Sequence, residues 1–508
     1  MDEISRIFLT HTANILCKRT GETIMSTMNI SLLTDLYELT MMQGYFKSRT
    51  NETVVFDMFY RHNPSDGGYA IAAGLEQVIE YIKNLRFSAE DIAYLEGLHI
   101  FDADFLDYLS TFRFSGDIYA IPEGTVVFPR EPLIKVIAPI MEAQLVETAI
   151  LTIINHQCLI ATKASRVVYA AQGDGIMEFG LRRAQGPDAG VYGARAAMIG
   201  GCIGTSNVLA GQLFDVPVKG THAHSWIMSF PDEYTAFKTY ADLYPNACCL
   251  LVDTYDTLKS GVPNAIRVFT EMRDSGLEMK NYGIRLDSGD LAYLSKKARR
   301  MLDAAGFTDA YISASSDLDE YLIDSLKAQG CRITSWGVGT NLITSKDCPS
   351  FGGVYKLAAI QDENGNFLPK IKLSDNTEKI TNPGNKTIYR IYEKDAHKVK
   401  ADLISLADET FDESEDLVIF DPAETWKHTR LKAGTYTMRE LLVPVFKNGE
   451  CVYTSPSVME IRDICTRELD TLWDETRRLV NPHEMYVDLS DKLYEMKKNL
   501  LSEMSRDM

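Results

Sequence analysis

Hydrophobic positions at the start of this chain follow two spacings in turn, and each spacing predicts a different element. Between Leu33 and Tyr45, apolar side chains recur every three or four residues, which is the spacing of an amphipathic helix. The stretch Thr53–Tyr60 then alternates in the manner of a β-strand. Short strands and helices continue to mix up to about residue 150. We therefore predict an α+β N-terminal domain over residues 29–150.

A second pattern begins near residue 170, where short apolar runs alternate with helical stretches. The runs end in small, polar or charged residues and lie at 176–179, 202–204, 216–220, 248–252, 282–286, 310–313 and 332–336. Helical spacing lies between them, for example at 262–273, 291–305 and 319–328. Such alternation predicts a parallel sheet, and seven or eight repeats of the unit indicate an α/β barrel. We assign this barrel to residues 151–360.

The two ends of the chain lack this alternation. Beyond residue 361, β-like segments flank the turn at 382–386, and helical spacing returns at 457–479, so residues 361–508 are predicted as a C-terminal domain of strands and helices. Residues 1–28 carry no strong pattern and no signal-peptide arrangement. We expect them to be a disordered extension.

Composition narrows the class of protein. Acidic residues exceed basic ones by 71 − 52 = 19, which disfavours nonspecific binding to nucleic acid. The nine cysteines are an odd number and contain no CxxC pair, so we expect reduced thiols in a cytoplasmic protein. No apolar run approaches the roughly 18–20 residues that a membrane span requires. We therefore expect neither a nucleic-acid nor a membrane partner.

Candidate chemistry follows the predicted strands, because active sites of α/β barrels lie where the strands end. His222 and His224 follow the third run, and imidazoles there could bind a metal, move a proton or accept a phosphoryl group. A multi-histidine metal site needs further imidazoles on later strand ends. The histidines after His224 all lie beyond the barrel, at His397, His428 and His483. A metal-dependent barrel hydrolase is therefore a disfavoured alternative.

Three further strand ends carry residues suited to a phosphorylated sugar and an aromatic acid. Arg285 and Asp287 could bind an anion and ribose hydroxyls or Mg²⁺, although a salt-bridged helix cap has the same composition. The glycine-rich turn at 337–341 could hold a phosphate through backbone N–H groups, although such turns are often only structural. Phe179 and Arg182 could stack on a ring and bind a carboxylate; the alternative is a core phenylalanine beside a surface arginine.

Together these motifs resemble one family, nicotinate phosphoribosyltransferase. The resemblance covers residues 29 to about 480 and rests on segments that are specific in combination, namely LLTDLYELTM at 32–41, GTHAHSW at 220–226, RLDSGD at 285–290, WGVGTN at 336–341 and TNPGNK at 381–386. It implies a type II phosphoribosyltransferase fold with an incomplete α/β barrel. It also implies a homodimer whose active sites are shared between subunits.

The resemblance also implies a reaction. Nicotinate and phosphoribosyl pyrophosphate would give nicotinate mononucleotide and pyrophosphate, as a step of NAD biosynthesis, with ATP hydrolysis coupled through a phosphohistidine and with Mg²⁺ required. It assigns no Mg²⁺ ligands. The chemistry is coherent by itself, since displacement of pyrophosphate at the ribose C1 atom needs positioned cations and carboxylates.

Residue roles are carried over from the family by position. Those nearest the chemistry are His224 as the phosphorylated histidine, Asp253 and Asp287 as carboxylates beside it and the ribose, and Tyr37, Phe179, Arg182 and Ser206 around nicotinate, with Tyr37 supplied by the other subunit. Those expected around the phosphates are Arg285, Ser316, Gly339 and Thr340 for the phosphoribosyl group, and Arg61, Lys346, Lys356 and Lys386 for pyrophosphate and ATP.

Two alternatives share the same scaffold. A nicotinamide phosphoribosyltransferase would carry an acidic residue after Gly204-Thr205, where this chain has Ser206. A non-catalytic sensor of pyridine nucleotides would have lost His224 or the Arg285 and Asp287 pair, and this chain keeps both.

Overall fold

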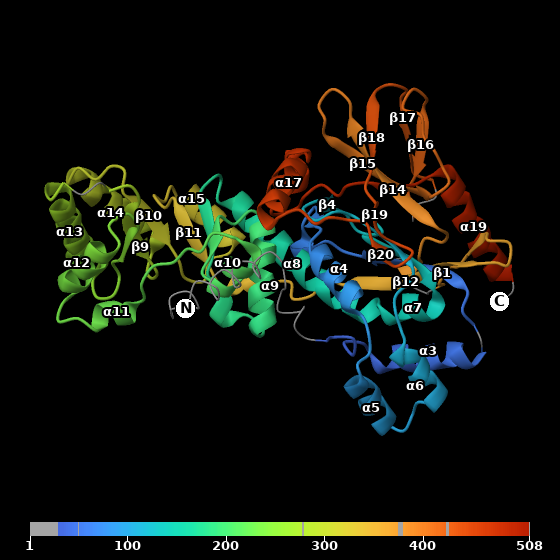
Figure 1. The fold of residues 1–508 in the computed structure, drawn as a ribbon. Helices are drawn as coiled ribbons and strands as arrows, with labels where there is room; N and C mark the ends of the chain where they lie inside the picture. The colour runs from blue at the N-terminus through green and yellow to red at the C-terminus, as the bar shows by residue number, and fades with distance from the viewer. Residues whose placement is uncertain (1–28, 49, 277–278, 374–378, 423–425, 507–508) are drawn as a thin grey trace, which may run out of the picture.

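The computed structural model describes residues 29–48, 50–276, 279–373, 379–422 and 426–506, so the expected extension at 1–28 lies outside the described residues. Three larger sheets and a two-stranded pair make up its β structure, and helices pack between and around them (Figure 1). The parallel sheet and its helices lie at one end of the molecule in Figure 1, and the other two large sheets lie at the other end. A long helix, α8 (Glu147–Ala170), lies between the two ends.

The first of the three larger sheets has seven strands and is antiparallel. The strand predicted at Thr53–Tyr60 is present with those bounds and is β1. In order across the sheet, the strands are β13 (Phe367–Pro369), β12 (Gly353–Gln361), β1, β5 (Ile134–Pro139), β3 (Asp117–Ala120), β19 (Val443–Lys447) and β20 (Glu450–Cys451). Strands from all three predicted domains therefore share one sheet. The boundaries at 150 and 360 stay predictions.

Helices surround this sheet, and a small strand pair lies beside it. The predicted first helix is present as α3, which begins at Leu36 rather than Leu33. The bounds are α3 (Leu36–Ser48), α4 (Leu75–Asn84), α5 (Ala89–Gly97), α6 (Ala103–Ser110) and α7 (Ile140–Leu145), with the pair β2 (Ala70–Ile71) and β4 (Val126–Val127).

The predicted incomplete α/β barrel is confirmed as a six-stranded parallel sheet. Its strands, in spatial order, are β7 (Gly204–Thr205), β6 (Gly175–Glu178), β11 (Ser335–Val338), β10 (Tyr311–Ala314), β9 (Tyr282–Leu286) and β8 (Cys248–Leu251). The predicted run at 216–220 forms only one bridge, from Val218 to Thr205. Pro217 in this run has no N–H to donate, which limits its pairing. The curled sheet therefore stays open between Val218 and β8.

Helices connect these strands as the alternation predicted. Three expected helices occur within two residues of their predicted bounds, as α13 (Val262–Asp274), α14 (Leu291–Ala304) and α15 (Glu320–Ala328). The others are α9 (Pro187–Ile199), α10 (Val208–Phe214), α11 (His224–Met228), α12 (Glu233–Leu243) and α16 (Thr340–Ile343), with the short helices η2 (Leu181–Arg183) and η3 (Thr257–Gly261).

The predicted C-terminal domain supplies a second sheet, which is antiparallel except for the parallel pair of β15 and β21. Its strands, in spatial order, are β17 (His428–Leu431), β16 (Leu417–Phe420), β21 (Val487–Leu489), β15 (Val399–Leu406), β14 (Lys386–Glu393) and β18 (Tyr436–Glu440). The helix expected at 457–479 divides into α17 (Val458–Asp470) and α18 (Asp474–Arg477), because the chain turns at Thr471 to Trp473. Helix α19 (Asp491–Arg506) ends the described chain.

Helix α8 and the adjoining α7 form the one helical stretch of the described residues that is long and apolar enough to cross a membrane by length and composition. Its apolar window is 67% buried inside the structure, and it carries the buried ionised residues Lys163 and Arg166. Both side chains form ion pairs with Glu320 of α15. These contacts fit a core helix that joins the two ends of the molecule.

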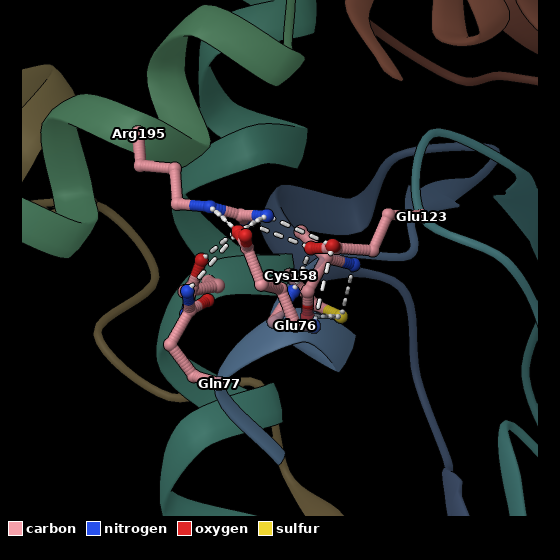
Figure 2. Close-up of polar contacts among 8 residues, drawn as sticks. Glu76, Gln77, Glu123, Cys158 and Arg195 are labelled. Atoms are coloured by element: carbon pink, nitrogen blue, oxygen red, sulfur yellow. Dashed lines mark hydrogen bonds and ion pairs between the residues drawn. The ribbon is translucent and has the colours of Figure 1, made fainter. Parts of the chain in front are cut away.

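A buried ionic cluster fixes α9 of the half-barrel to the N-terminal region (Figure 2). The guanidinium of Arg195 is fully buried and lies 2.8 Å from the Glu123 carboxylate and 2.7 Å from that of Glu76. Gln157 of α8 accepts a third hydrogen bond, at 3.0 Å. Burial alone would raise the pKa of Glu123, but the charge and hydrogen bonds of Arg195 outweigh it and lower that pKa.

Candidate active site

Asp253 lies at the centre of the polar groups that follow the parallel strands. It comes two residues after β8, and its side chain is 1% exposed. One carboxylate oxygen, Oδ1, lies 3.2 Å from Nε2 of His224, the first residue of α11. The other, Oδ2, accepts hydrogen bonds from the Asp287 N–H at 3.0 Å and the Ser288 hydroxyl at 2.6 Å. The buried carboxylate of Asp253 thus connects the end of β8 to the start of α11 and to the turn that follows β9.

Arg285 and Asp287 lie together at the end of β9. An Nη of Arg285 donates to Oδ1 of Asp287 at 3.0 Å, and Nε donates to the Ser315 hydroxyl at 2.7 Å. Ser315 in turn donates to Asp287. Burial alone would raise the pKa of Asp287, but the bonds from Ser315 and Arg285 outweigh it and hold the pKa below its usual range. Thr221 accepts a further bond from Arg285, at 2.6 Å.

His222, the first histidine of the pair, occupies a different environment from His224. Its ring is buried, and Nε2 accepts a hydrogen bond from the backbone N–H of Leu251 at 3.3 Å. Leu251 belongs to β8, which is the edge strand next to the opening of the sheet. The His222 imidazole therefore accepts the hydrogen bond from the Leu251 N–H that a further paired strand would otherwise have accepted. Burial lowers the pKa of His222 to about 4. These contacts give His222 a structural role.

Phe179 lies directly after β6 and packs against β11. A Cβ atom on Gly337 would lie 2.5 Å from the Phe179 ring, so only glycine leaves room for the ring there. The residue before it, Glu178, is fully buried and accepts hydrogen bonds from the Gly180 N–H and from the Thr205 hydroxyl at 2.6 Å. Burial raises the pKa of Glu178. This carboxylate fixes the loop that carries Phe179 next to the end of β7.

The other expected contacts for nicotinate border this loop. Arg182 lies in η2 and is exposed, whereas Ser206 follows β7, is half-buried and donates its N–H to the carbonyl of Glu178. Arg182 and Ser206 thus flank the loop that carries Phe179.

The ends of β10 and β11 carry the residues expected around phosphate. Gly339 precedes the short helix α16, which begins at Thr340. Asn341 of that helix donates to the carbonyls of Asp317 and Leu318 and thereby joins the two loops. Ser316 is exposed and has a φ of 120°, a strained conformation for a residue with a Cβ atom. Neighbouring Ser315, rather than Ser316, contacts Arg285.

Lys163 and Arg166 of α8 form a buried ionic cluster with the chain segments that follow the loops after β10 and β11. Nζ of Lys163 lies 2.7 Å from Glu320, the first residue of α15, and 2.6 Å from Asp347, which follows Lys346. Arg166 holds the other oxygen of Glu320 at 3.0 Å. Sequence patterns gave no indication of this cluster, because the basic residues are more than 150 residues away from their acidic partners.

Four of the expected residues lie outside the half-barrel. Tyr37 is on α3, far from β9 to β11 (Figure 1), and its ring is 45% exposed. Arg61 directly follows β1, and Lys356 lies on the neighbouring strand β12. Burial lowers the pKa of Lys356, the negative charge of Glu147 opposes this shift, and the positive charges of Lys372 and Arg61 add to it. Lys386 is buried and pairs with Asp57 at 2.7 Å. A phosphate contact by Lys386 stays a prediction, and its described contacts are structural ones.

The fit of the site to Mg²⁺ depends on its donor atoms. Among the described residues, no group of three or more histidine, cysteine or acidic side chains could hold a metal ion. The carboxylates of Asp287 and Asp253 nevertheless lie at the strand ends, and oxygen is the donor that Mg²⁺ prefers. Because Mg²⁺ is commonly held by one or two carboxylates plus substrate phosphates, these residues fit an ion that shares its ligands with the substrate.

Comparison with known proteins indicates the same family over most of the chain. Models of the nicotinate phosphoribosyltransferase N-terminal domain, family and C-terminal domain match residues 32–155, 175–392 and 385–497, respectively. The chain is 48% identical to nicotinate phosphoribosyltransferase of Bacillus subtilis over 476 residues, which cover 94% of this chain and 96% of that one. It is 32% identical to the human enzyme of the same name, over 92% of this chain and 96% of that one.

The fold agrees with these sequence matches. The crystal structure of human nicotinic acid phosphoribosyltransferase superposes with a TM-score of 0.80 over 92% of this chain and 99% of that one, at 30% identity. Coverage of 92% of this chain extends beyond the half-barrel to the other two large sheets, so the resemblance is not limited to a shared barrel. The chain belongs to the nicotinate phosphoribosyltransferase family.

Proposed function

We propose that this protein transfers a phosphoribosyl group from phosphoribosyl pyrophosphate to nicotinate, giving nicotinate mononucleotide and pyrophosphate, as a cytoplasmic step of NAD biosynthesis. The observation that carries the proposal is the cluster of His224, Asp253, Asp287 and Arg285 at the open edge of the half-barrel in a chain of this family. Product formation from the two substrates, with and without ATP, is the primary test.

The ribose chemistry uses the Arg285 and Asp287 pair. The pyridine nitrogen forms a bond to C1 of the ribose while the bond from C1 to pyrophosphate breaks, and positive charge develops on the sugar. The lowered pKa of Asp287 keeps its carboxylate ionised, and an anion there stabilises this charge. Arg285, fixed by Ser315 and Thr221, is positioned to hold a phosphate or a ribose hydroxyl.

His224 couples ATP hydrolysis to this transfer. Asp253 can only accept hydrogen bonds when ionised, so its contact with Nε2 assigns the imidazole proton to that nitrogen and leaves the lone pair on Nδ1. Nδ1 then attacks the γ-phosphorus of ATP, the bond to ADP breaks, and ADP leaves. The proton stays on Nε2 and shares the negative charge of Asp253, which stabilises the phosphorylated ring.

Mg²⁺ would supply charge neutralisation of the pyrophosphate and ATP phosphates when bound. Asp287 and Asp253 are the residues that would help to hold it. The cations Arg61, Lys346 and Lys356 are proposed to bind the same phosphates, and Gly339, Thr340 and Ser316 the 5′-phosphate. Chelation of Mg²⁺ should abolish turnover without unfolding the protein, since the contacts within the site are made by protein groups alone.

The active site is proposed to be completed by a second copy of the chain. Tyr37 is the expected second aromatic beside nicotinate, yet its helix α3 lies far from β11, against which Phe179 packs (Figure 1). Exposed apolar side chains surround it on and before α3, including Leu33, Leu36 and Met41 at 39–54% exposure. A homodimer would bury this face against the partner's half-barrel. Mixing Tyr37→Ala and Phe179→Ala chains tests this, because a heterodimer would regain one intact site.

Nicotinate is preferred over nicotinamide in this proposal because Arg182 and uncharged Ser206 border the Phe179 loop. A charged hydrogen bond to the nicotinate carboxylate contributes about 1.5–3 kcal/mol, or roughly ten- to a hundredfold in selectivity. Competition of the two bases at equal concentration measures this directly. Equal or faster use of nicotinamide would contradict the assignment.

The phosphohistidine has its own test. Incubation with γ-labelled ATP and Mg²⁺ should label the protein through an acid-labile, base-stable bond. His224→Asn should abolish the label, and His222→Asn should retain it. Loss of label only in His222→Asn would show that the other histidine is phosphorylated.

A further inference from the structure

A basic depression lies at the end of the half-barrel where the parallel strands begin. It encloses about 650 Å³ and is lined by Lys296, Arg299, Arg300, Asp303, Thr308, Gln329, Gly330 and Arg332. These residues come from the second half of α14 and from the loops that lead into β10 and β11. The proposed active site lies where the same strands end. Helix α14 begins directly after the Asp287–Asp290 turn, where the strands end, and runs back to the depression, where they begin.

Arg299 and Asp303 already neutralise each other in this depression. Nε of Arg299 donates to Asp303 at 2.8 Å, and its Nη atoms donate to the carbonyls of Ala310 and Phe307. Asp303 is the one acidic residue in the lining. Arg299 and Asp303 therefore form part of the wall of the depression. No other acidic side chain in the lining is available to pair with the remaining cations.

Three cations remain without a partner. Within the described part of the chain, the charged ends of Lys296, Arg300 and Arg332 make no hydrogen bond or ion pair. Lys296 and Arg300 are four residues apart on α14, where like charges repel each other. An uncompensated group of three positive charges is unusual on a chain whose net charge is −19.

The backbone around these cations is held in place by buried contacts. The N–H of Arg332 donates to the hydroxyl of fully buried Ser295 on α14, at 3.1 Å, which fixes the loop before β11 against the helix. Gly330, at a φ of 71°, ends α15 with an N–H bond to Lys327, and Cys331 donates back to Leu326. The cations are thus presented from a preformed wall rather than from a free loop.

We propose that this depression binds a small molecule carrying two or more phosphate groups. Three cations and the Thr308 hydroxyl suit phosphate oxygens, and guanidinium groups bind them with paired N–H donors. The lining contains no aromatic ring on which a base could stack, so recognition is through the phosphates. The volume lies within the range of small-molecule sites and exceeds the needs of a single phosphate. This site does not depend on the proposed reaction.

Inorganic tripolyphosphate is the probe that tests it. Calorimetry on the full chain should detect a binding site that is lost, or weakened about tenfold or more, in the variant Lys296→Ala/Arg300→Ala/Arg332→Ala. The matched control is Lys297→Ala, because Lys297 lies on the same helix outside the depression and faces the ring of Tyr293. Turnover of nicotinate should be unchanged in both variants. Unchanged stoichiometry and affinity in the triple variant would overturn the proposal.

A second measurement on the unaltered protein avoids any effect of the substitutions on folding. Lysine acetylation followed by mass spectrometry should show that tripolyphosphate protects Lys296 and leaves Lys297 as reactive as before. Protection should disappear at high salt, because the contacts are ionic and solvent-exposed. Equal reactivity of Lys296 with and without tripolyphosphate would contradict the site even if the triple variant failed to fold.

Discussion

Asp253 joins His224 to the turn that follows β9, since one carboxylate oxygen lies 3.2 Å from the imidazole and the other accepts the N–H of Asp287 at 3.0 Å. The proposed phosphoryl acceptor and the proposed ribose carboxylate are therefore positioned by the same buried side chain. In the proposed mechanism, phosphorylation of His224 would change the charge that Asp253 experiences, and the hydrogen bond from the Asp287 N–H would pass this change to the backbone of Asp287. The two halves of the proposed coupled reaction would thus share one structural element.

Asp253→Asn should lower the rate of His224 phosphorylation by about a hundredfold or more, within the range lost when a residue assisting acid–base chemistry is removed. Asparagine can present an amide donor to Nε2 and so favours the wrong tautomer. Labelling with γ-labelled ATP measures the effect. Asp256→Asn is the control, because Asp256 caps the following helix through Leu258 and Lys259 and does not contact His224. Equal labelling of the two variants would contradict the role of Asp253.

Lys386→Met should destabilise the protein by about 3–5 kcal/mol, because it leaves the buried carboxylate of Asp57 without its partner. Denaturant unfolding measures the loss, and Asp57→Asn in the same chain should restore part of it. A Lys386→Met protein of unchanged stability but with a raised KM for phosphoribosyl pyrophosphate would instead support the phosphate contact expected from the family.

Arg195→Met should cost about 3–5 kcal/mol of unfolding free energy, because Glu123 stays buried without its counter-charge. In the unaltered protein the pKa of Glu123 is lowered, so the stability from this pair is present at neutral pH and lost as pH falls. The stability difference between the two proteins should therefore shrink in acid. A further Glu123→Gln change should recover stability at neutral pH. A difference that is constant with pH would exclude this explanation.

Ser316→Gly should raise the unfolding free energy by about 1 kcal/mol, because glycine adopts a φ of 120° without the steric cost that serine incurs. Ser316→Ala is the matched control and should bring no gain, since it keeps the Cβ atom. If the hydroxyl binds the 5′-phosphate as proposed, both variants should show a raised KM for phosphoribosyl pyrophosphate. A thermal or denaturant series together with steady-state kinetics separates the two effects.

Glu38 should make stability depend on pH near neutrality. Burial raises its pKa to about 7, against an ordinary value of 4.5, although hydrogen bonds from Thr148 oppose the shift. A carboxyl whose pKa is raised by folding favours the folded state at low pH, and this contribution is lost as pH rises through the folded pKa. Relative to Glu38→Gln, the unaltered protein should lose stability between about pH 4.5 and pH 7 and then level off. A flat difference across this range would show that Glu38 stays ionised.

Much of the half-barrel was predictable because its strands follow one another and each run carries its own pattern. Helices α13, α14 and α15 were bounded to within two residues for the same reason. The run at 216–220 was predicted as a full strand because it is apolar, but it contains Pro217 and pairs only through Val218. Local pattern therefore predicted elements well and predicted their pairing less well.

The supporting contacts of the site could not be predicted from pattern. Ser315 and Ser316 are adjacent and chemically identical, and only the three-dimensional path of the loop shows that Ser315 meets Arg285. Glu178 resembles a polar residue that closes a strand, yet it is fully buried below the loop of Phe179. Lys163 and Arg166 lie within an apolar helix, and their partners are Glu320 at the start of α15 and Asp347 after α16, both distant in the sequence. Such pairs depend on tertiary packing.

The seven-stranded sheet also constrains how the chain can fold during its synthesis. β1 pairs with β12, about 300 residues later, and β3 pairs with β19, more than 320 residues later. The half-barrel strands are all complete by Val338, whereas β3 has an unpaired edge until Val443–Lys447 has left the ribosome. The half-barrel can therefore form first, while the N-terminal strands wait with exposed edges that invite aggregation. A nascent chain of this protein thus depends on a strand in the last fifth of its length, β19, to cover the edge of a strand in its first quarter, β3.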